Sequence, residues 1–256
     1  MTILALDIGN TSTHFGLFGS KGSLDATFTF PTAAIISGDR INAELIPQLS
    51  SLGNLDSIFI ASVVPEATKS LEQLLKRSHA ETKVRTLKNQ DIPLINRYQD
   101  PSKVGIDRLL VSLAAYTNWG RTEKKPTVVI DFGTATTFDC TNAGGEYLGG
   151  IIALGVASTA NQLSRIAAQL PKIALEFPHH VLGSSTTESM QSGILFGALA
   201  MTEGLLTRIQ EEVFPNQEII VVATGGLAKL FEGRTSIINH FALNLVLEGI
   251  AITVNS

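Results

Sequence analysis

A short sequence pattern occurs twice in this chain, and it limits the possible folds more than any other feature. Residues 4–11 read Leu-Ala-Leu-Asp-Ile-Gly-Asn-Thr, and residues 128–135 read Val-Val-Ile-Asp-Phe-Gly-Thr-Ala. Each copy predicts an apolar strand that ends at an aspartate and is followed by a glycine turn. Because the copies are separated by about half of the 256 residues, the repeat predicts a duplicated domain. We expect two α/β lobes, each opened by a β-hairpin, with the functional site in a cleft between them.

The hydrophobic pattern between and after the two copies predicts further strands and helices. Strands are expected over residues 57–64, 84–87, 147–152 and 218–223, and helices over about 38–49, 66–78, 104–119 and, with breaks, 156–213. The charged stretch 120–126 is the best candidate for a linker. We therefore assign residues 1–119 to the first lobe and residues 120–256 to the second.

The composition excludes several classes of protein. The 19 Lys and Arg residues are outnumbered by 23 Asp and Glu residues, so the chain lacks the basic excess that nucleic-acid binding requires. Its single cysteine, Cys140, can form neither an intramolecular disulfide nor a cysteine zinc site. The N-terminus has no cationic leader, and no apolar stretch approaches the ~20 residues that span a bilayer. We expect a cytoplasmic protein without nucleic-acid or membrane partners.

The first turn, Asp7–Thr13, has the residue types of an anion-binding site. Gly9 allows a positive φ and Asn10 tolerates the left-handed conformation, so the turn can be sharp. The hydroxyl side chains that follow lie beside backbone N–H groups, a combination that can bind phosphate. Asp7 could hold a hydrated Mg²⁺. An ordinary hairpin turn is the alternative.

The second turn, Asp131–Thr137, offers the same chemistry in the second half of the chain. Two such turns would grip a polyphosphate and its cation from both sides. Residues 223–226 read Ala-Thr-Gly-Gly and follow an apolar strand. Gly225 and Gly226 could form a flat shelf for a nucleoside, although a plain strand-to-helix turn explains them equally well.

A fourth motif, Gly105–Arg108, lies at the predicted start of a helix. Asp107 could accept a proton from a substrate hydroxyl. Arg108 could offer a fork of donors to a carboxylate or a phosphate. The alternative is an Asp-Arg pair in a first helical turn, where the aspartate suits the helix dipole.

These four motifs, in this order, resemble those of the type III pantothenate kinases, in the superfamily of acetate and sugar kinases and actin. The family's Asp-x-Gly-Asn-Thr corresponds to Asp7–Thr11, its Gly-x-Asp-Arg to Gly105–Arg108, and its Asp-x-Gly-Thr-Ala-x-Thr to Asp131–Thr137. The resemblance runs over nearly the full length. It implies an α/β fold of two duplicated ribonuclease H-like (actin-like ATPase) lobes. Further matches are Ser62–Pro65, Tyr98, Pro101, Gly149–Ile152, Ser185–Thr186 and Ser192–Gly193.

One residue departs from the family pattern. The family has proline where this chain has Leu154, just before Gly155. Because proline locks φ, we expect a less rigid turn here without a loss of activity.

The resemblance also implies roles for individual residues. Asp107 is expected to be the catalytic base that takes the proton from the pantothenate hydroxyl. Asp131 is expected to hold a monovalent cation, K⁺ or NH₄⁺, and Asp7 to be a ligand of the Mg²⁺ that accompanies ATP. The expected pantothenate-binding residues are Tyr98, Gly105, Ile106, Asp107, Arg108 and Thr186. The expected ATP-binding residues, including the nucleoside shelf, are Asp7, Ile8, Gly9, Asn10, Thr11, Ser12, Thr13, His14, Thr134, Gly225 and Gly226.

The predicted function is ATP-dependent phosphorylation of pantothenate to 4'-phosphopantothenate, the first step of coenzyme A synthesis. One alternative is a non-catalytic accessory factor of a transcription regulator, and three carboxylates at Asp7, Asp107 and Asp131 argue against it. Another alternative is a different small-molecule kinase or an ATPase of the superfamily, and Gly105–Arg108 with its upstream Tyr98 argues against that.

The family also implies a homodimer. Residues 156–170 and 190–206 predict helices that are rich in Ala, Leu and Ile, with Arg165 and Glu203 as their only charged side chains. We expect part of their apolar surface to pair with a second copy of the chain. The alternative is that both helices belong to the core of the second lobe.

Overall fold

The computed structural model describes residues 2–19 and 22–256, and the chain forms two compact units. Unit 1 contains the residues up to Ala114 together with Leu245–Ser256, and unit 2 contains Ala115–Asn244. The division lies five residues before the expected boundary at residue 119. It also places the last helix, α8 (Leu245–Asn255), in the first unit, whereas we expected it in the second lobe.

The packing of α8 within unit 1 explains this difference. A Cβ on Gly16 would lie 2.9 Å from Leu247 Cδ1, so α8 rests on the sheet of unit 1 where that sheet has no side chain. Gly249 approaches a neighbouring helix so closely that a Cβ there would lie 2.4 Å from the Leu110 carbonyl oxygen. These contacts bury α8, an apolar helix whose sequence predicts burial but does not indicate which sheet or helix it packs against.

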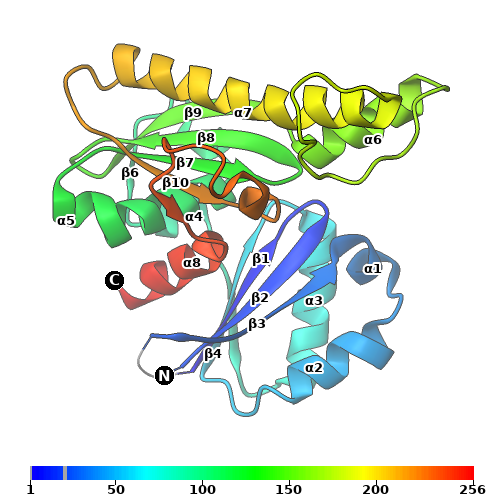
Figure 1. Ribbon diagram of the computed structural model, residues 1–256. Coiled ribbons are helices and arrows are strands. Elements are labelled where there is room, and N and C mark those ends of the chain that lie inside the picture. The colour runs from blue at the N-terminus through cyan, green and yellow to red at the C-terminus, as the bar shows by residue number, and fades with distance from the viewer. Residues whose placement is uncertain (1, 20–21) are drawn as a thin grey trace. The chain divides into compact units, whose positions relative to one another are not determined.

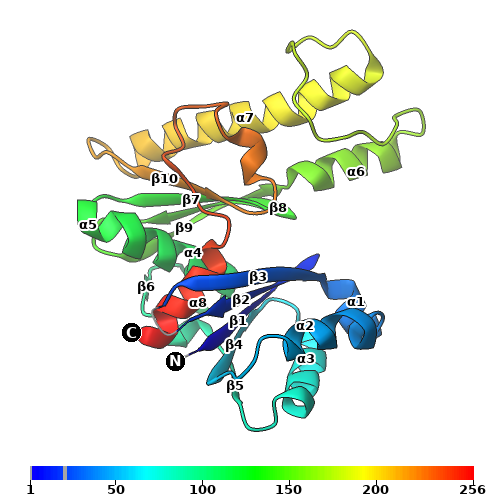
Figure 2. The ribbon, with the colours of Figure 1, turned by 60° about the horizontal axis from the view of Figure 1, so that its bottom comes forward.

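The sheet of unit 1 has the strand order β3-β2-β1-β4-β5. Strands β1, β2 and β3 are antiparallel neighbours, and β4 and β5 extend the sheet in parallel with β1. Strand β1 is almost entirely buried because it is apolar and central (Figures 1 and 2). The strands are β1 (Ile3–Ile8), β2 (Ser12–Phe18), β3 (Leu24–Pro31), β4 (Ser57–Ser62) and β5 (Lys83–Thr86). The helices of unit 1 are α1 (Thr32–Ser37), α2 (Ile46–Ser50), α3 (Pro65–Ser78), α4 (Ile106–Ala115) and α8, and a short strand β6 covers Ile95–Asn96.

Unit 2 repeats this topology with its own strands. The order β11-β10-β7-β8-β9 corresponds, strand for strand, to β5-β4-β1-β2-β3 of unit 1, with the same parallel and antiparallel neighbours. The predicted duplication of a ribonuclease H-like unit is thereby confirmed. The strands are β7 (Thr127–Phe132), β8 (Ala135–Thr141), β9 (Glu146–Leu154), β10 (Ile220–Thr224) and β11 (His240–Phe241), and the helices are α5 (Arg121–Glu123), α6 (Val156–Ile166) and α7 (Thr186–Glu212).

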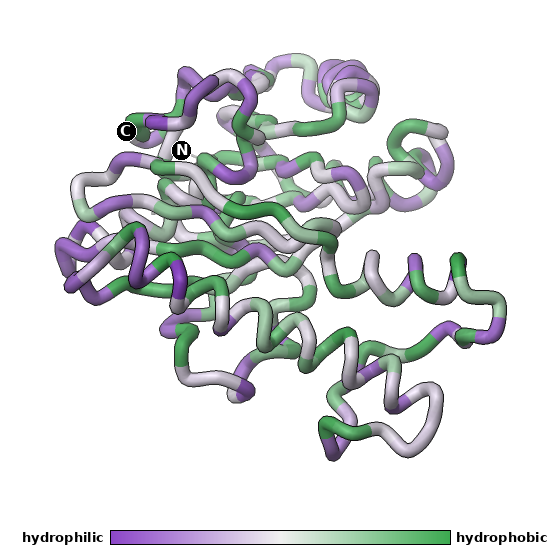
Figure 3. The backbone as a smooth tube through the Cα atoms, turned by 90° about the horizontal axis from the view of Figure 1, so that it is seen from above, coloured by the Kyte–Doolittle hydropathy of each residue, from purple (hydrophilic) through white to green (hydrophobic). Residues whose placement is uncertain are grey.

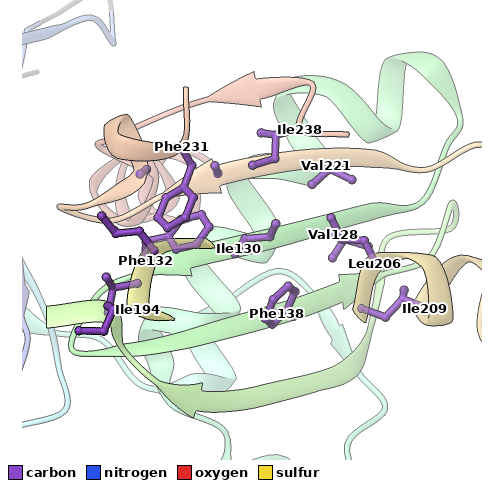
Figure 4. Close-up of a cluster of buried hydrophobic side chains, with 14 of the residues drawn as sticks. Val128, Ile130, Phe132, Phe138, Ile194, Leu206, Ile209, Val221, Phe231 and Ile238 are labelled. Atoms are coloured by element: carbon purple, nitrogen blue, oxygen red, sulfur yellow. The ribbon is translucent and has the colours of Figure 1, made fainter. Parts of the chain in front are cut away.

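The core of unit 2 lies between one face of its sheet and helices α6 and α7. Phe132 of β7 stacks on Phe231 with ring centroids 4.2 Å apart, and Leu206 and Ile209 of α7 cover Val128 (Figure 4). Figure 3 shows that hydrophobic and hydrophilic stretches alternate along the backbone. Among the described residues, no helix has the length and apolar content needed to cross a membrane.

Two local elements of unit 1 differ from the expectations. Strand β3 has no predicted counterpart, although the alternation of Phe28 and Phe30 with threonines is a strand signal. The helix expected over residues 38–49 is interrupted at its start. Helix α1 ends at Ser37 and is capped by Gly38, which has a left-handed φ of +82°, and helical turns resume from Ile41.

Candidate active site

The first turn joins β1 to β2 and presents its polar residues at the end of the hairpin. The Gly9 N–H donates to the Ser12 carbonyl over 3.0 Å, and Asp7 lies opposite His14 in the hairpin register. Asn10 and Thr11 are exposed, whereas Ile8 and Thr13 are buried. The Thr13 hydroxyl faces the Thr32 hydroxyl at 3.0 Å. Thr13 therefore supports the turn from behind and does not offer its hydroxyl to a ligand.

The glycines of both turns allow oxygen atoms of the chain to lie close to their Cα atoms, and neither glycine adopts a left-handed backbone conformation. Neither Gly9 nor Gly133 has a positive φ, contrary to the expectation for Gly9, and Asn10 also has a negative φ. A Cβ on Gly9 would lie 3.1 Å from the Ser12 carbonyl oxygen, and one on Gly133 would lie 3.1 Å from Asp131 Oδ1. The turn positions favour glycine because a side chain there would crowd these oxygens.

Asp107 lies in the first turn of α4 and is partly buried. Its Oδ1 accepts the backbone N–H of Arg108 over 2.9 Å, and a Cβ on Gly105 would lie 2.4 Å from the same oxygen. Burial raises the pKa of the Asp107 carboxyl, and the Arg108 N–H and guanidinium oppose this shift. A carboxylate with a raised pKa is a better proton acceptor than an exposed one.

The loop before α4 is fixed by asparagine side chains. Asn89 Nδ2 donates to the Val104 carbonyl over 2.8 Å and to the Pro101 carbonyl over 3.2 Å. Asn96 Nδ2 also donates to Pro101, and its Oδ1 accepts the Tyr98 N–H over 3.0 Å. The backbone of Tyr98 is thus tied to the segment that leads into α4, and the Tyr98 side chain remains exposed. Neither asparagine belongs to one of the predicted motifs.

In unit 2, the second turn is shorter by one residue than the first. The Gly133 N–H donates to the Ala135 carbonyl over 3.1 Å, and Asp131 lies opposite Thr137. Thr134 is exposed at the tip of the turn. Its carbonyl accepts both the Gly155 N–H over 3.2 Å and the Ser158 hydroxyl over 2.7 Å.

Gly155 must be a glycine for a steric reason, which bears on the departure at Leu154. A Cβ on Gly155 would lie 2.3 Å from the Gly133 carbonyl oxygen and 2.4 Å from that of Thr134. Leu154 pairs with Ala135 at the end of β9 and is largely exposed. The hydrogen bond that joins the end of β9 to the second turn is donated by the Gly155 N–H, so it forms although position 154 holds leucine and not the family's proline.

The two glycines after β10 differ in their surroundings. Gly225 has a φ of +89°, and a Cβ there would lie 2.2 Å from Asp131 Oδ1 and 2.7 Å from the Phe132 carbonyl carbon. Gly226 is exposed, and a Cβ there would have no neighbour within 4 Å. Only Gly226 leaves open space of the kind that a nucleoside shelf requires, while Gly225 closes over Asp131. Where the alternative of a strand-to-helix turn expects a helix, the chain forms a single 3-10 turn, Ala228–Phe231.

Thr186 is the first residue of α7 and borders an apolar groove between α6 and α7. The groove has a volume of about 420 Å³ and is lined by Thr159, Leu163, Leu170, Thr186, Ser189, Met190, Gly193 and Ile194. Thr159 is the neighbour of Ser158, which holds the second turn. Two neighbouring residues near the start of α6 thus lie between Thr186 and the second turn. Thr159 lines the same groove as Thr186, and Ser158 donates its hydroxyl to Thr134 in the second turn.

The donor set limits the kind of metal ion that the described residues can bind. Within the described parts of the chain, no three His, Cys, Asp or Glu side chains form a group that could hold a metal ion. A single carboxylate such as that of Asp131 fits a monovalent cation, which needs little counter-charge. A Mg²⁺ bound to ATP keeps several waters and needs only one or two carboxylates, so Asp7 also fits its expected role.

Comparison with known proteins identifies the family. A sequence profile described as type III pantothenate kinase matches residues 3–208. Type III pantothenate kinase 1 of Symbiobacterium thermophilum is 35% identical over 98% of this chain and 95% of its own length.

Two solved structures share the fold at low sequence identity. A protein named as a Baf family transcriptional activator from Campylobacter jejuni has a TM-score of 0.62 at 19% identity, over 98% of this chain and 97% of its own. A protein named as a 2-dehydro-3-deoxygalactonokinase from Sinorhizobium meliloti has a TM-score of 0.59 at 16% identity, over 99% and 98% of the two chains. The structural likeness agrees with the duplicated topology, and the profile and sequence matches show that this chain belongs to the type III pantothenate kinase family.

Proposed function

We propose that this protein transfers the terminal phosphate of ATP to the hydroxyl of pantothenate, giving 4'-phosphopantothenate, ADP and a proton. The observation that carries the proposal is Asp107. It is a partly buried carboxylate with a raised pKa at the start of α4, inside the Gly-x-Asp-Arg motif of this family. The product enters coenzyme A synthesis as its first intermediate.

Asp107 acts as the base in this proposal. It accepts the proton of the pantothenate hydroxyl while that oxygen forms its bond to phosphorus and the bond to the ADP oxygen breaks. Arg108 follows Asp107 on the same helical turn and supplies a fixed positive charge for an anionic substrate group. Tyr98, Gly105, Ile106 and Thr186 complete the proposed pantothenate-binding set.

Phosphoryl transfer requires positioning and charge neutralisation more than covalent chemistry from the protein. The turn from Asp7 to His14 supplies backbone N–H groups and a carboxylate for the ATP phosphates and their Mg²⁺. In unit 2, Thr134, Gly225 and Gly226 are the proposed ATP-binding residues, with the open face at Gly226 for the nucleoside. Asp131 would hold K⁺ or NH₄⁺, whose charge would offset that of the phosphates.

The proposal includes a homodimer and a cytoplasmic location. Helix α6 contributes Val156 and Ala160 to the core of unit 2, and α7 contributes residues such as Met190 and Leu206. Part of the surface of both helices is therefore buried within unit 2, as the alternative of core helices expects. The groove next to Thr186 and the exposed Ile166 and Leu182 are apolar surface that remains uncovered in the single chain. A second copy of the chain would cover it.

A kinase assay on the purified full chain tests the function. ATP, pantothenate and K⁺ are combined, ADP release is measured, and other hydroxy compounds are tried in place of pantothenate. Asp107→Asn should lower kcat by ~10²–10⁴ because the amide cannot accept the proton. Asp100→Asn is the matched control, since Asp100 is exposed and caps a turn, a role that asparagine also fills. Absence of pantothenate-dependent ADP release in the wild type would refute the function.

A further inference from the structure

Thr32 is a fully buried residue, outside every motif of the sequence, that makes three contacts with the first turn. Its hydroxyl donates to the Gly9 carbonyl over 2.7 Å, and its backbone N–H donates to the Thr11 carbonyl over 3.1 Å. Because the Thr32 proton is committed to Gly9, the Thr13 hydroxyl at 3.0 Å is the donor in the third contact. The turn is therefore held from one side through two of its carbonyls.

These two contacts determine where the N–H groups of the turn point. In a planar trans peptide, the carbonyl of one residue and the N–H of the next point in opposite directions. The Gly9 and Thr11 carbonyls point towards Thr32, so the N–H groups of Asn10 and Ser12 point away from it. Backbone N–H groups that are directed to one side of a turn can bind an anion there.

Unit 2 reaches a similar arrangement with different residues. Gly155 occupies the position of Thr32 in the repeat, directly after the third strand, and its N–H donates to the Thr134 carbonyl. Gly155 has no hydroxyl, and the Ser158 hydroxyl donates to the same carbonyl over 2.7 Å. In each copy, a backbone N–H and a hydroxyl from the start of the following helix hold carbonyl groups of the turn, two of them in unit 1 and one in unit 2. This recurrence within one chain indicates that the direction of the peptide groups, and not a particular side chain, is what the turn needs.

We propose that Thr32 is a positioning residue for the phosphate groups of ATP. By holding the Gly9 carbonyl away from the ligand, the Thr32 hydroxyl keeps the Asn10 N–H directed at the phosphates. Without that hydroxyl, the Gly9 peptide can rotate, and its carbonyl then turns a partial negative charge towards an anion. The inference rests on the proposed function and assigns to Thr32 a part in it that does not involve contact with the nucleotide.

Thr32→Val tests the proposal because valine keeps the shape and the backbone N–H but removes the hydroxyl. The dissociation constants of ADP and of adenosine are measured by calorimetry on the full chain, and circular dichroism checks the fold. Hydrogen bonds to charged groups are strong enough that their loss should weaken ADP binding by about 10- to 100-fold. Adenosine, which lacks phosphate, should bind within about twofold of its wild-type affinity. In steady-state kinetics, KM for ATP should rise while KM for pantothenate stays the same.

Two further variants control for structural damage. Thr32→Ser restores the hydroxyl and should restore ADP affinity. Thr82→Val removes a similar hydrogen bond, which the Thr82 hydroxyl donates to the Leu55 carbonyl over 3.2 Å. Because this bond lies at the ends of the parallel strands of unit 1 that are opposite to the first turn, Thr82→Val should leave ADP affinity unchanged. If Thr32→Val does not fold, Thr32→Ala replaces it.

The outcomes separate this inference from the proposed function. A folded Thr32→Val or Thr32→Ala protein that binds ADP like the wild type overturns the role of Thr32. Equal losses for ADP and adenosine also overturn it, because they would indicate general damage. A wild type that neither binds ADP nor phosphorylates pantothenate refutes the proposed function itself.

Discussion

Replacing Gly225 with alanine tests how closely unit 2 packs around Asp131. The φ of +89° at Gly225 is unfavourable for any residue with a Cβ, at a cost of ~1–2 kcal/mol. The new Cβ would also lie 2.2 Å from Asp131 Oδ1 and 2.7 Å from the Phe132 carbonyl carbon. The carboxylate can rotate away, but the backbone of β7 is held between β8 and β10. Relief of this overlap should cost ~1–3 kcal/mol. We expect the free energy of unfolding to fall by ~2–5 kcal/mol in total.

Gly226→Ala is the matched control, one residue along the chain. Gly226 has no positive φ, and a Cβ there would meet no atom within 4 Å, so we expect a change within ~0.5 kcal/mol. Urea and thermal unfolding followed by circular dichroism measure both variants. At ~2–4 °C for each kcal/mol in a chain of this size, Gly225→Ala should lower Tm by ~4–20 °C.

The two variants should also differ in function. Gly226→Ala should raise KM for ATP, because its open face is the proposed contact with the nucleoside, while its stability stays near that of the wild type. If Gly225→Ala and Gly226→Ala unfold at the same urea concentration, the close approach of Gly225 to β7 does not constrain the fold and the reasoning is refuted.

Three further predictions concern charge, cations and assembly. Burial raises the pKa of the Asp107 carboxyl above its ordinary value of 3.8, so the folded state loses stability as the pH rises from 3.8 through that raised pKa. Asp107→Asn should therefore have a higher Tm than the wild type at pH 7, and this difference in Tm should vanish as the pH is lowered towards 3.8. The opposite order of Tm at pH 7 would contradict this sign. At constant ionic strength, both activity and Tm should be higher in KCl or NH₄Cl than in NaCl, and Asp131→Asn should remove the difference; equal values for the wild type in all three salts would exclude a selective cation site. Light scattering should give a mass near twice 27.3 kDa, and a mass of one chain would exclude the dimer.

The sequence alone was sufficient to predict the two hairpins and their duplication. An apolar strand, an Asp-x-Gly turn and a second strand form through contacts between neighbouring residues, so the pattern at Leu4–Thr11 and at 128–135 predicts each hairpin directly. The start of α4 was also predictable to within two residues, at 104 against the observed Ile106, since the change from a polar loop to helical spacing is local. For the same reason, local patterns suffice to identify Asp7, Asp107 and Asp131 as candidate site residues.

Only the tertiary structure could assign α8 to unit 1 and Thr32 to the first turn. Helix α8 is apolar on most of its surface, so its pattern predicts burial but not the partner, which is selected by the bare surfaces at Gly16 and Gly249. The Thr32 hydroxyl reaches Gly9 across 23 residues because β3 returns beside β2 and delivers the start of α1 to the turn. A threonine after a proline carries no local signal of that contact. Local sequence determines the turns, and the return path of the chain determines which buried groups hold them in place.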